Sequence, residues 1–404
     1  MPPAANIISL LTSCQVVNSW SVSRWLAFTL GLVLTFANHV SAQVWTKTSA
    51  PNKSWVAVAS SADGNKLAAA FQSNGGGIYT STNAGATWTP TLEPAKYWTG
   101  LASSADGCVL LAVANYNGTT GGVYTSTNSG GNWVSNAVPV NFYQMGATAV
   151  SASGKTLIVG GVVSSPGLAY YSTNMGATWS FNGLTTGGYW SSVACSGDGA
   201  SAKLAADWGG NYYSSTNAGV TWTNYIASGS SILVSSADAS HLFLYGSGML
   251  VSTNWGVNWQ SASQPNGYME MAAASDAKRV VGLYAGNVYV STDFAATWTT
   301  SYAPNKTWKA IGLSADGSKM VAVASSSSDG IYVWQPPTLS NTNVAGNLFF
   351  SWPTNGTTFN LQMKTNLFAT NWVNASTAPT VTNGMNQVVI VPTNGNAFFR
   401  LNAQ

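Results

Sequence analysis

Four carboxylates stand apart from the recurring turns of this chain and could do acid–base chemistry: Glu93, Asp207, Glu270 and Asp329. Glycoside hydrolysis uses two carboxyl groups, one as the acid and one as the base or nucleophile. The spacing along the chain does not set any two of the four at a catalytic separation. Charged side chains in solvated loops are therefore the alternative interpretation, and we favour it.

A second set of residues suits binding rather than bond cleavage. Aromatic residues recur at one equivalent position, just before an expected inner strand, and in three copies a lysine lies two residues earlier. Aromatic rings can stack on sugars or receive a protein loop, and lysine can donate hydrogen bonds. We predict a ligand-binding face here; packing of the same rings between sheets is the alternative. The residues are Trp55, Trp98, Trp190, Trp308 and Tyr268, with Lys53, Lys96 and Lys306, and with Trp208 beside Asp207.

Other chemistries lack the residues that they require. His241 is the only histidine after residue 42, and its place beside the turn at Asp238 favours a structural role over a Ser-His-Asp triad. No His/Cys cluster has metal-ligand spacing and no loop is dense in carboxylates, so we expect no metal and no cofactor. The net charge is +3 without a basic stripe. We therefore expect no nucleic-acid or nucleotide partner.

An eight-residue phrase that recurs six times must help to position these side chains. The copies recur roughly every 40–45 residues, a period typical of propellers and solenoids. Each copy lies between alternating, β-prone segments, and its Asn and Gly suit a tight hairpin turn closed by the final Trp. The sixth copy has Ala295 in place of Gly, so we expect that turn to be distorted. The copies are Ser81–Trp88, Ser126–Trp133, Ser172–Trp179, Ser215–Trp222, Ser252–Trp259 and Ser291–Trp298.

A second phrase alternates with the first and lies between apolar runs. Its clearest copies are Ser61–Gly64, Ser104–Gly107, Ser236–Ala239 and Ser314–Gly317. An Asp-Gly pair between two such runs predicts a hairpin. Each repeat then has four strands, A to D, with this phrase as the A-to-B turn and the eight-residue phrase as the C-to-D turn. Four antiparallel strands per repeat make a propeller blade.

The two ends of the repeat region complement each other. The last repeat stops after its third strand, at Ile331–Trp334, and is followed by Pro336 and Pro337, which cannot continue a strand ladder. The segment Val44–Trp55 parallels Thr297–Trp308 and would supply the missing strand. We therefore predict an all-β fold, a seven-bladed β-propeller over residues 43–335 whose ring is closed by the N-terminal strand, which leaves no exposed sheet edge.

The eight-residue phrase resembles the Asp-box, or BNR, repeat S-x-[DN]-x-G-x-x-W, and five copies match it fully. Propellers with this repeat include sialidases, which resemble one another in three arginines that grip the sugar carboxylate, and xyloglucan-cleaving enzymes with two tandem propellers. This chain has only Arg24, Arg279 and Arg400, and a single one of them falls in the predicted propeller. The resemblance therefore extends to the fold and not to sialidase activity.

The two ends of the chain indicate export. Arg24 precedes the apolar run Trp25–Phe36, and Val40-Ser41-Ala42 fits a signal-peptidase site. We predict a signal peptide over residues 1–42, cleaved after Ala42, and a secreted or cell-surface protein; an uncleaved membrane anchor is the alternative. Residues 336–404 predict a small β-sandwich of fibronectin or immunoglobulin type, which resembles a C-terminal module of exported Verrucomicrobia proteins. We expect no disulfide between Cys108 and Cys195.

These observations favour a monomeric, non-catalytic, exported binding propeller. It would recognise a glycan or a cell-surface partner on the face formed by the D-to-A and B-to-C connections. A glycoside hydrolase that uses two of the four carboxylates is one alternative. A protein-assembly or adhesion scaffold is the other, as in the photosystem II assembly factors that resemble this repeat, although those carry an arginine patch that this chain lacks.

Overall fold

The computed structural model divides the chain into two compact units, one over Trp45–Trp334 and the other formed by Gln335–Gln404 with the N-terminal segment up to Val44. Both units consist of β-strands, so the predicted all-β class is confirmed. None of the described residues forms a helix long and apolar enough to cross a membrane. The structure describes residues 26–27 and 44–403, except 73–74, 116–120, 137, 139–143, 163–166, 187–189, 207–210, 227–231, 263–269, 302, 336–338, 345, 354–358, 365–370, 383–384 and 392–396.

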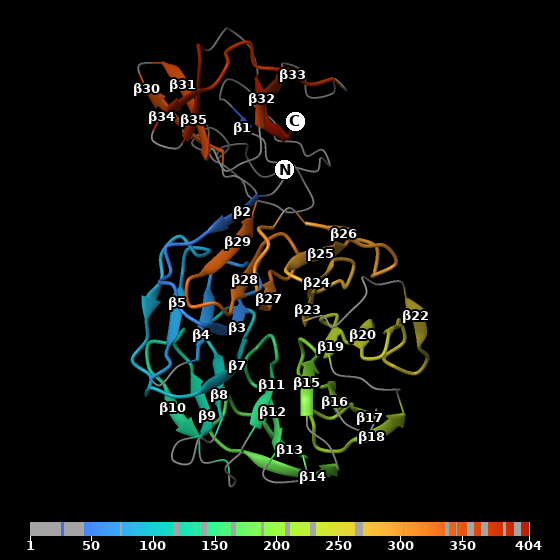
Figure 1. Cartoon of the computed structure of the whole chain (residues 1–404). Helices are drawn as coiled ribbons and strands as arrows, with labels where there is room; N and C mark the ends of the chain where they lie inside the picture. The colour runs from blue at the N-terminus through green and yellow to red at the C-terminus, as the bar shows by residue number, and fades with distance from the viewer. Residues whose placement is uncertain are drawn as a thin grey trace, which may run out of the picture. The chain divides into compact units, whose positions relative to one another are not determined.

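The described strands of the larger unit form seven four-stranded antiparallel sheets arranged around a central axis (Figure 1). The first three sheets are β3 (Trp55–Ser60), β4 (Leu67–Phe71), β5 (Ile78–Ser81) and β6 (Thr89–Pro90); β7 (Trp98–Ser103), β8 (Leu110–Ala114), β9 (Gly122–Ser126) and β10 (Val134–Asn136); and β11 (Gln144–Val150), β12 (Leu157–Val162), β13 (Gly167–Ser172) and β14 (Ser180–Thr186). In each sheet the strand order follows the chain order, as the four-strand repeat predicts.

The remaining four sheets repeat this arrangement, and the last one takes its outer strand from the other end of the repeat region. They are β15 (Trp190–Cys195), β16 (Ala202–Ala206), β17 (Asn211–Ser215) and β18 (Thr223–Ile226); β19 (Ile232–Ser235), β20 (Leu242–Tyr245), β21 (Met249–Ser252) and β22 (Gln260–Ala262); β23 (Glu270–Ala273), β24 (Val280–Tyr284), β25 (Asn287–Ser291) and β26 (Thr299–Thr300); and β27 (Trp308–Leu313), β28 (Met320–Ala324), β29 (Ile331–Gln335) and β2 (Val44–Lys47).

A cyclic series of backbone hydrogen bonds joins the sheets through their A-to-B turns. The N–H of Ala62 donates to the carbonyl of Ala105 in the next sheet, and the equivalent residue of each sheet repeats the contact until Ala315 donates back to Ala62. The seven N···O distances lie between 2.5 and 2.9 Å. Because these bonds use only backbone groups, they hold the ring together at this end whatever side chains the other end carries.

The C-to-D turns repeat one hydrogen-bond pattern. In the first copy the Ser81 hydroxyl donates to Asn83 and accepts the N–H of Gly85 at 2.9 Å. The expected distortion of the sixth copy is wrong: Ala295 donates to Ser291 at the same 2.9 Å and adopts φ of 66°, in the left-handed region. The hydrogen bonds of the turn thus hold an alanine in a conformation that costs about 1–2 kcal/mol for a residue with a Cβ.

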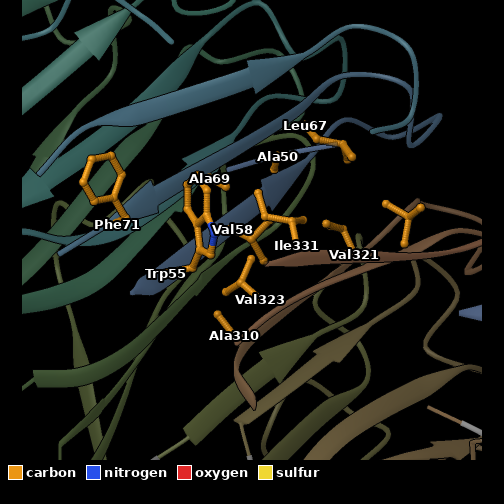
Figure 2. Packing of buried hydrophobic residues seen from close by; sticks show 11 residues of the cluster. Ala50, Trp55, Val58, Leu67, Ala69, Phe71, Ala310, Val321, Val323 and Ile331 are labelled. Atoms are coloured by element: carbon orange, nitrogen blue, oxygen red, sulfur yellow. The ribbon is translucent and has the colours of Figure 1, made fainter. Parts of the chain in front are cut away.

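Apolar side chains between the sheets form most of the core. Figure 2 shows Trp55 and Val58 of β3 facing Val323 of β28 and Ile331 of β29, which belong to the neighbouring sheet. Equivalent clusters lie between other pairs of sheets. Each sheet here has a neighbouring sheet packed on both of its faces. The strands in the middle of a sheet are therefore apolar at consecutive positions rather than at every second position.

The smaller unit consists of two four-stranded sheets that share one core. The core joins Phe350 and Trp352 of one sheet to Leu361 and Phe399 of the other. The first sheet has the order β30 (Ser340–Val344), β31 (Asn347–Pro353), β35 (Met385–Ile390) and β34 (Thr380–Thr382), and the second has β1 (Leu26–Ala27), β36 (Phe398–Ala403), β32 (Phe359–Lys364) and β33 (Val373–Asn374). Strand β1 lies within the segment whose sequence predicts a signal peptide.

Candidate functional site

The four tryptophans predicted to bind ligand do occupy equivalent positions. Trp55, Trp98, Trp190 and Trp308 each begin an inner strand, and the pairing register shifts directly after each of them. This shift is a β-bulge, which adds one residue to the inner strand and turns the following side chain. The recurrence of tryptophan at this position therefore coincides with a recurring β-bulge in the backbone.

Three of the four tryptophan rings have no face available to a ligand. Trp55 and Trp98 are 0% exposed and Trp190 is 4% exposed. Each ring packs edge-on against a tyrosine of its own sheet, at centroid distances of 5.6, 5.2 and 5.3 Å. The tyrosines are Tyr79, Tyr124 and Tyr213. For these three positions the structure shows packing between sheets, the alternative interpretation, rather than a ligand-facing ring.

Two of the predicted lysines belong to the same aromatic layers. The Lys53 Nζ atom lies 5.1 Å from the ring centroid of Phe71, and Lys96 Nζ lies 5.8 Å from that of Tyr124. Both distances are typical of cation–π contacts. These lysines cover aromatic side chains of the sheet, which explains why a lysine precedes the tryptophan in these connections.

Trp308 differs from the other three because its side chain is partly exposed. Its ring packs edge-on against Tyr332 at 5.2 Å and lies 5.8 Å from the ring of Trp45. Like those of the other three tryptophans, its buried Nε1 atom has no hydrogen-bond partner among the described residues. Two residues earlier, Lys306 forms an ion pair with the buried Asp329, with 2.7 Å between Nζ and Oδ1. The hydrogen bond to Asp329 raises the pKa of Lys306, the charge of Tyr332 raises it further, and desolvation opposes this rise.

Glu270 breaks the repeat on the neighbouring sheet. In the pairing register it is equivalent to Ala57, Ala147 and Ala310, which are buried. Burial raises the pKa of the Glu270 carboxyl to about 7, and the positive charge of Lys309 opposes that rise. Lys309 is the exposed bulge residue that directly follows Trp308.

We call Glu270, Lys306, Trp308, Lys309 and Asp329 the Trp308 cluster. Lys306 and Asp329 lie in D-to-A and B-to-C connections, while Glu270 and Trp308 begin inner strands, so all belong to the end of the sheets opposite the A-to-B turns. Only 6% of the chain is charged, yet Trp308 lies in the sequence between Lys306, which pairs with Asp329, and Lys309, whose charge acts on Glu270. The sequence reasoning missed Lys309; the signal was a lysine at the position where other copies have Val56, Thr99 and Ser191.

Glu93 does not belong to the Trp308 cluster. Glu93 accepts hydrogen bonds from the N–H of Ile78, at 2.5 Å, and from the hydroxyl of Thr91, so it anchors the start of β5. Burial raises the pKa of its carboxyl. Asp207, Trp208 and Tyr268 lie outside the described residues.

Two further polar residues are occupied in contacts within the sheets. The Nδ1 atom of His241 lies 2.9 Å from the Ser240 hydroxyl, and its ring stacks on Phe294 at 5.2 Å. The guanidinium of Arg279 donates to the Gly317 carbonyl at 2.7 Å, in the A-to-B turns at the opposite end from the Trp308 cluster. In the described part of the chain, no three His, Cys, Asp or Glu side chains gather as metal ligands would.

No protein-family model matches the chain, and no curated protein matches it by sequence. Solved structures with a similar fold include YCF48 from Cyanidioschyzon merolae, with a TM-score of 0.53, 15% identity and coverage of 72% of this chain and 98% of that one. A structure of YCF48 bound to a D1 peptide gives a TM-score of 0.53 and 14% identity, and covers 74% and 98% of the two chains.

The GH74 xyloglucanase from Xanthomonas campestris is also similar, with a TM-score of 0.53 and 14% identity over 77% of this chain. The match spans 59% of the xyloglucanase. Both kinds of neighbour are β-propellers, and identities this low establish the propeller fold alone.

Proposed function

We propose that the protein is a non-catalytic binding propeller, exported by its N-terminal segment, that recognises a glycan at the Trp308 cluster. The observation that carries the proposal is that Trp308, alone among the four equivalent tryptophans, is partly exposed, and that two lysines with acidic partners, Lys306 and Lys309, flank it in the sequence. An indole face can stack on a sugar ring, and charged groups beside it form strong hydrogen bonds with hydroxyls.

The charges of the cluster suit a ligand without a strong charge of its own. Lys306 is paired with Asp329, and Lys309 lies close enough to Glu270 to lower its pKa. Paired charges of this kind can still donate and accept hydrogen bonds, but their net charge is close to zero and attracts an ion only weakly. A neutral glycan therefore fits the cluster better than a phosphorylated or sulfated one.

Affinity electrophoresis of the full chain through gels that contain neutral polysaccharides tests the proposal. We expect one polymer to retard the protein, and we expect Trp308→Ala to abolish the retardation. Trp255→Ala is the matched control, because Trp255 is 56% exposed but lies on a C-to-D turn of another sheet. Equal retardation of the two variants, or no retardation by any polymer, would reject the cluster as a glycan site and favour a protein partner instead.

Glycoside hydrolysis remains a second candidate because of one observation. A carboxyl group with a pKa of about 7 stays partly protonated at neutral pH, as a general acid must. Asp329, on the neighbouring sheet, would be the second carboxylate. In this case Glu270→Gln should abolish the release of reducing ends from the retarding polymer while it preserves the retardation. If the unmodified protein releases no reducing ends, hydrolysis is excluded for that polymer.

A further inference from the structure

The smaller unit carries an unusual distribution of charge. Residues 335–404 contain two charged side chains, Lys364 and Arg400, and no Asp or Glu. Both are cations, and no acidic side chain of this segment can neutralise either of them.

The sheet register brings the two cations to one face. Strand β32 pairs with β36 so that Lys364 lies opposite Phe398, and Gln362 lies opposite Arg400. Residues that are directly opposite, or two apart along a strand, share one face of a sheet. The alternate residues, Leu361 and Phe399, fill the core that the two sheets share. Lys364 and Arg400 therefore lie on the face turned away from that core.

Both cations are nevertheless buried. Lys364 is 9% exposed and Arg400 is 5% exposed. The Lys364 Nζ atom lies 4.8 Å from the ring centroid of Trp372, and the Arg400 Cζ atom lies 4.5 Å from it. Burial lowers the pKa of both groups, and the charge of Arg400 lowers that of Lys364 further. The indole ring of Trp372 thus lies close to two like charges.

One edge of the Arg400 guanidinium is held by hydrogen bonds, and another is buried without one. Its Nε atom donates to Gln362 Oε1 at 2.8 Å, and the Gln362 amide in turn donates to Asn374 Oδ1 at 2.9 Å. Among the described residues, the buried NH1 atom has no hydrogen-bond partner. A buried donor without a partner destabilises the folded state, and more so when it is charged, unless a ligand satisfies it.

We propose that Arg400, Lys364 and Trp372 form an anion-binding site on the outer face of β32 and β36 that takes a sulfate or phosphate group. Arg400 presents its free donor in a fixed plane because Gln362 holds its Nε atom, and Lys364 adds a point charge beside it. The ligand is either the free ion or a polymer that carries the group. This site is separate in the chain from the Trp308 cluster and does not depend on it.

Equilibrium dialysis of the full chain against labelled sulfate and phosphate, at constant ionic strength, tests the site. We expect one saturable site per chain in the unmodified protein. Arg400→Gln and Lys364→Gln should each weaken binding about tenfold or more, as expected for the loss of a charge-assisted hydrogen bond. Lys155→Gln is the control, because it removes an exposed lysine of the larger unit.

Further measurements separate the sources of the anion and guard against misfolding. Retardation by dextran sulfate but not by dextran identifies a polymer-borne group, whereas dialysis without such retardation identifies the free ion. Arg400→Lys keeps the charge but not the planar fork, so its binding should be intermediate. Circular dichroism identifies any variant that has failed to fold. Absence of saturable binding in the unmodified protein, or equal binding in folded Arg400→Gln, would overturn the proposal.

Discussion

Replacing Glu270 by glutamine should make the protein more stable at neutral and alkaline pH and leave it unchanged in acid. Burial raises the pKa of this carboxyl from its ordinary 4.5 to about 7. A group whose pKa is higher in the folded state binds protons more tightly there, so folding is opposed as the pH rises through that interval. The penalty is absent below about pH 4.5 and complete above about pH 7, and a glutamine carries none of it.

The size of the effect follows from the two pKa values. Each tenfold change in proton affinity corresponds to about 1.4 kcal/mol, which gives about 3 kcal/mol for a rise from 4.5 to about 7. The side chain is partly exposed, and solvent screening lowers the measurable gain, so we expect about 1–3 kcal/mol at about pH 8. The urea midpoint should then rise by up to about 1 M, given a denaturant slope of about 3 kcal/mol per molar.

Urea unfolding of the two proteins between about pH 4 and pH 8 measures this difference, and the titration of all other carboxyl groups cancels in it. Lys309→Met provides a second variant. Because the charge of Lys309 lowers the pKa of Glu270, its removal should move the pH dependence of the unmodified side chain to higher pH. A difference between Glu270→Gln and the unmodified protein that is the same at both ends of the pH range would refute this account of Glu270.

Three further predictions concern the scaffold. Gly85→Ala should destabilise the protein by about 2–4 kcal/mol in thermal melts, because φ is 86° and the added Cβ would lie 2.8 Å from Val333. The reverse change at the equivalent position, Ala295→Gly, should alter stability by less than about 1 kcal/mol, since relief of the left-handed strain offsets the loss of one buried methyl group. Trp98→Ala should lower the free energy of unfolding in urea by about 3–5 kcal/mol, because the ring is fully buried. Unlike Trp308→Ala, it should not alter the retardation of the folded protein by polysaccharide. Loss of retardation in both variants would show that the two rings act alike. Burial raises the pKa of the half-buried Cys195 thiol to about 12, so a disulfide reagent at about pH 8 should label it much more slowly in the native protein than after unfolding, and equally rapid labelling in the two states would contradict the raised pKa.

The sheets could be predicted from the sequence because their signals are local. The Ser, Asn and Gly of each C-to-D turn bond to one another within a few residues, so the same short phrase produces the same turn wherever it recurs. The prediction failed at Ala295 because it considered only the preference of glycine for a left-handed φ, whereas the hydrogen bond that the Ala295 N–H donates to the Ser291 hydroxyl decides the conformation. Propensity for a left-handed φ is weaker than a complete set of turn hydrogen bonds.

The candidate site could be predicted only in part, because exposure depends on the neighbouring sheet. Trp98 and Trp308 begin equivalent strands, yet one is fully buried and the other is partly exposed. The residues next to each tryptophan in the sequence do not predict which side chains of the adjacent sheet pack against it. Glu270 shows the same limit, since its raised pKa arises from its surroundings and not from the residues beside it in the chain.

The difference between the two ends of the sheets explains where function could arise in this fold. At the A-to-B end, the cyclic series of backbone hydrogen bonds and the serine–aspartate contacts leave each turn little freedom, and the same pattern returns from Asp63 to Asp316. At the other end, the described parts of the connections show no such series, and there the repeat is broken by Glu270 and by Lys309. Substitutions away from a repeat add nothing to its packing: a carboxyl at an alanine position and an exposed lysine at a bulge both cost stability or leave it unchanged. Residues retained at such a cost are better explained by a ligand than by the fold, and for this reason the Trp308 cluster, rather than the more regular tryptophans, is the site to test first.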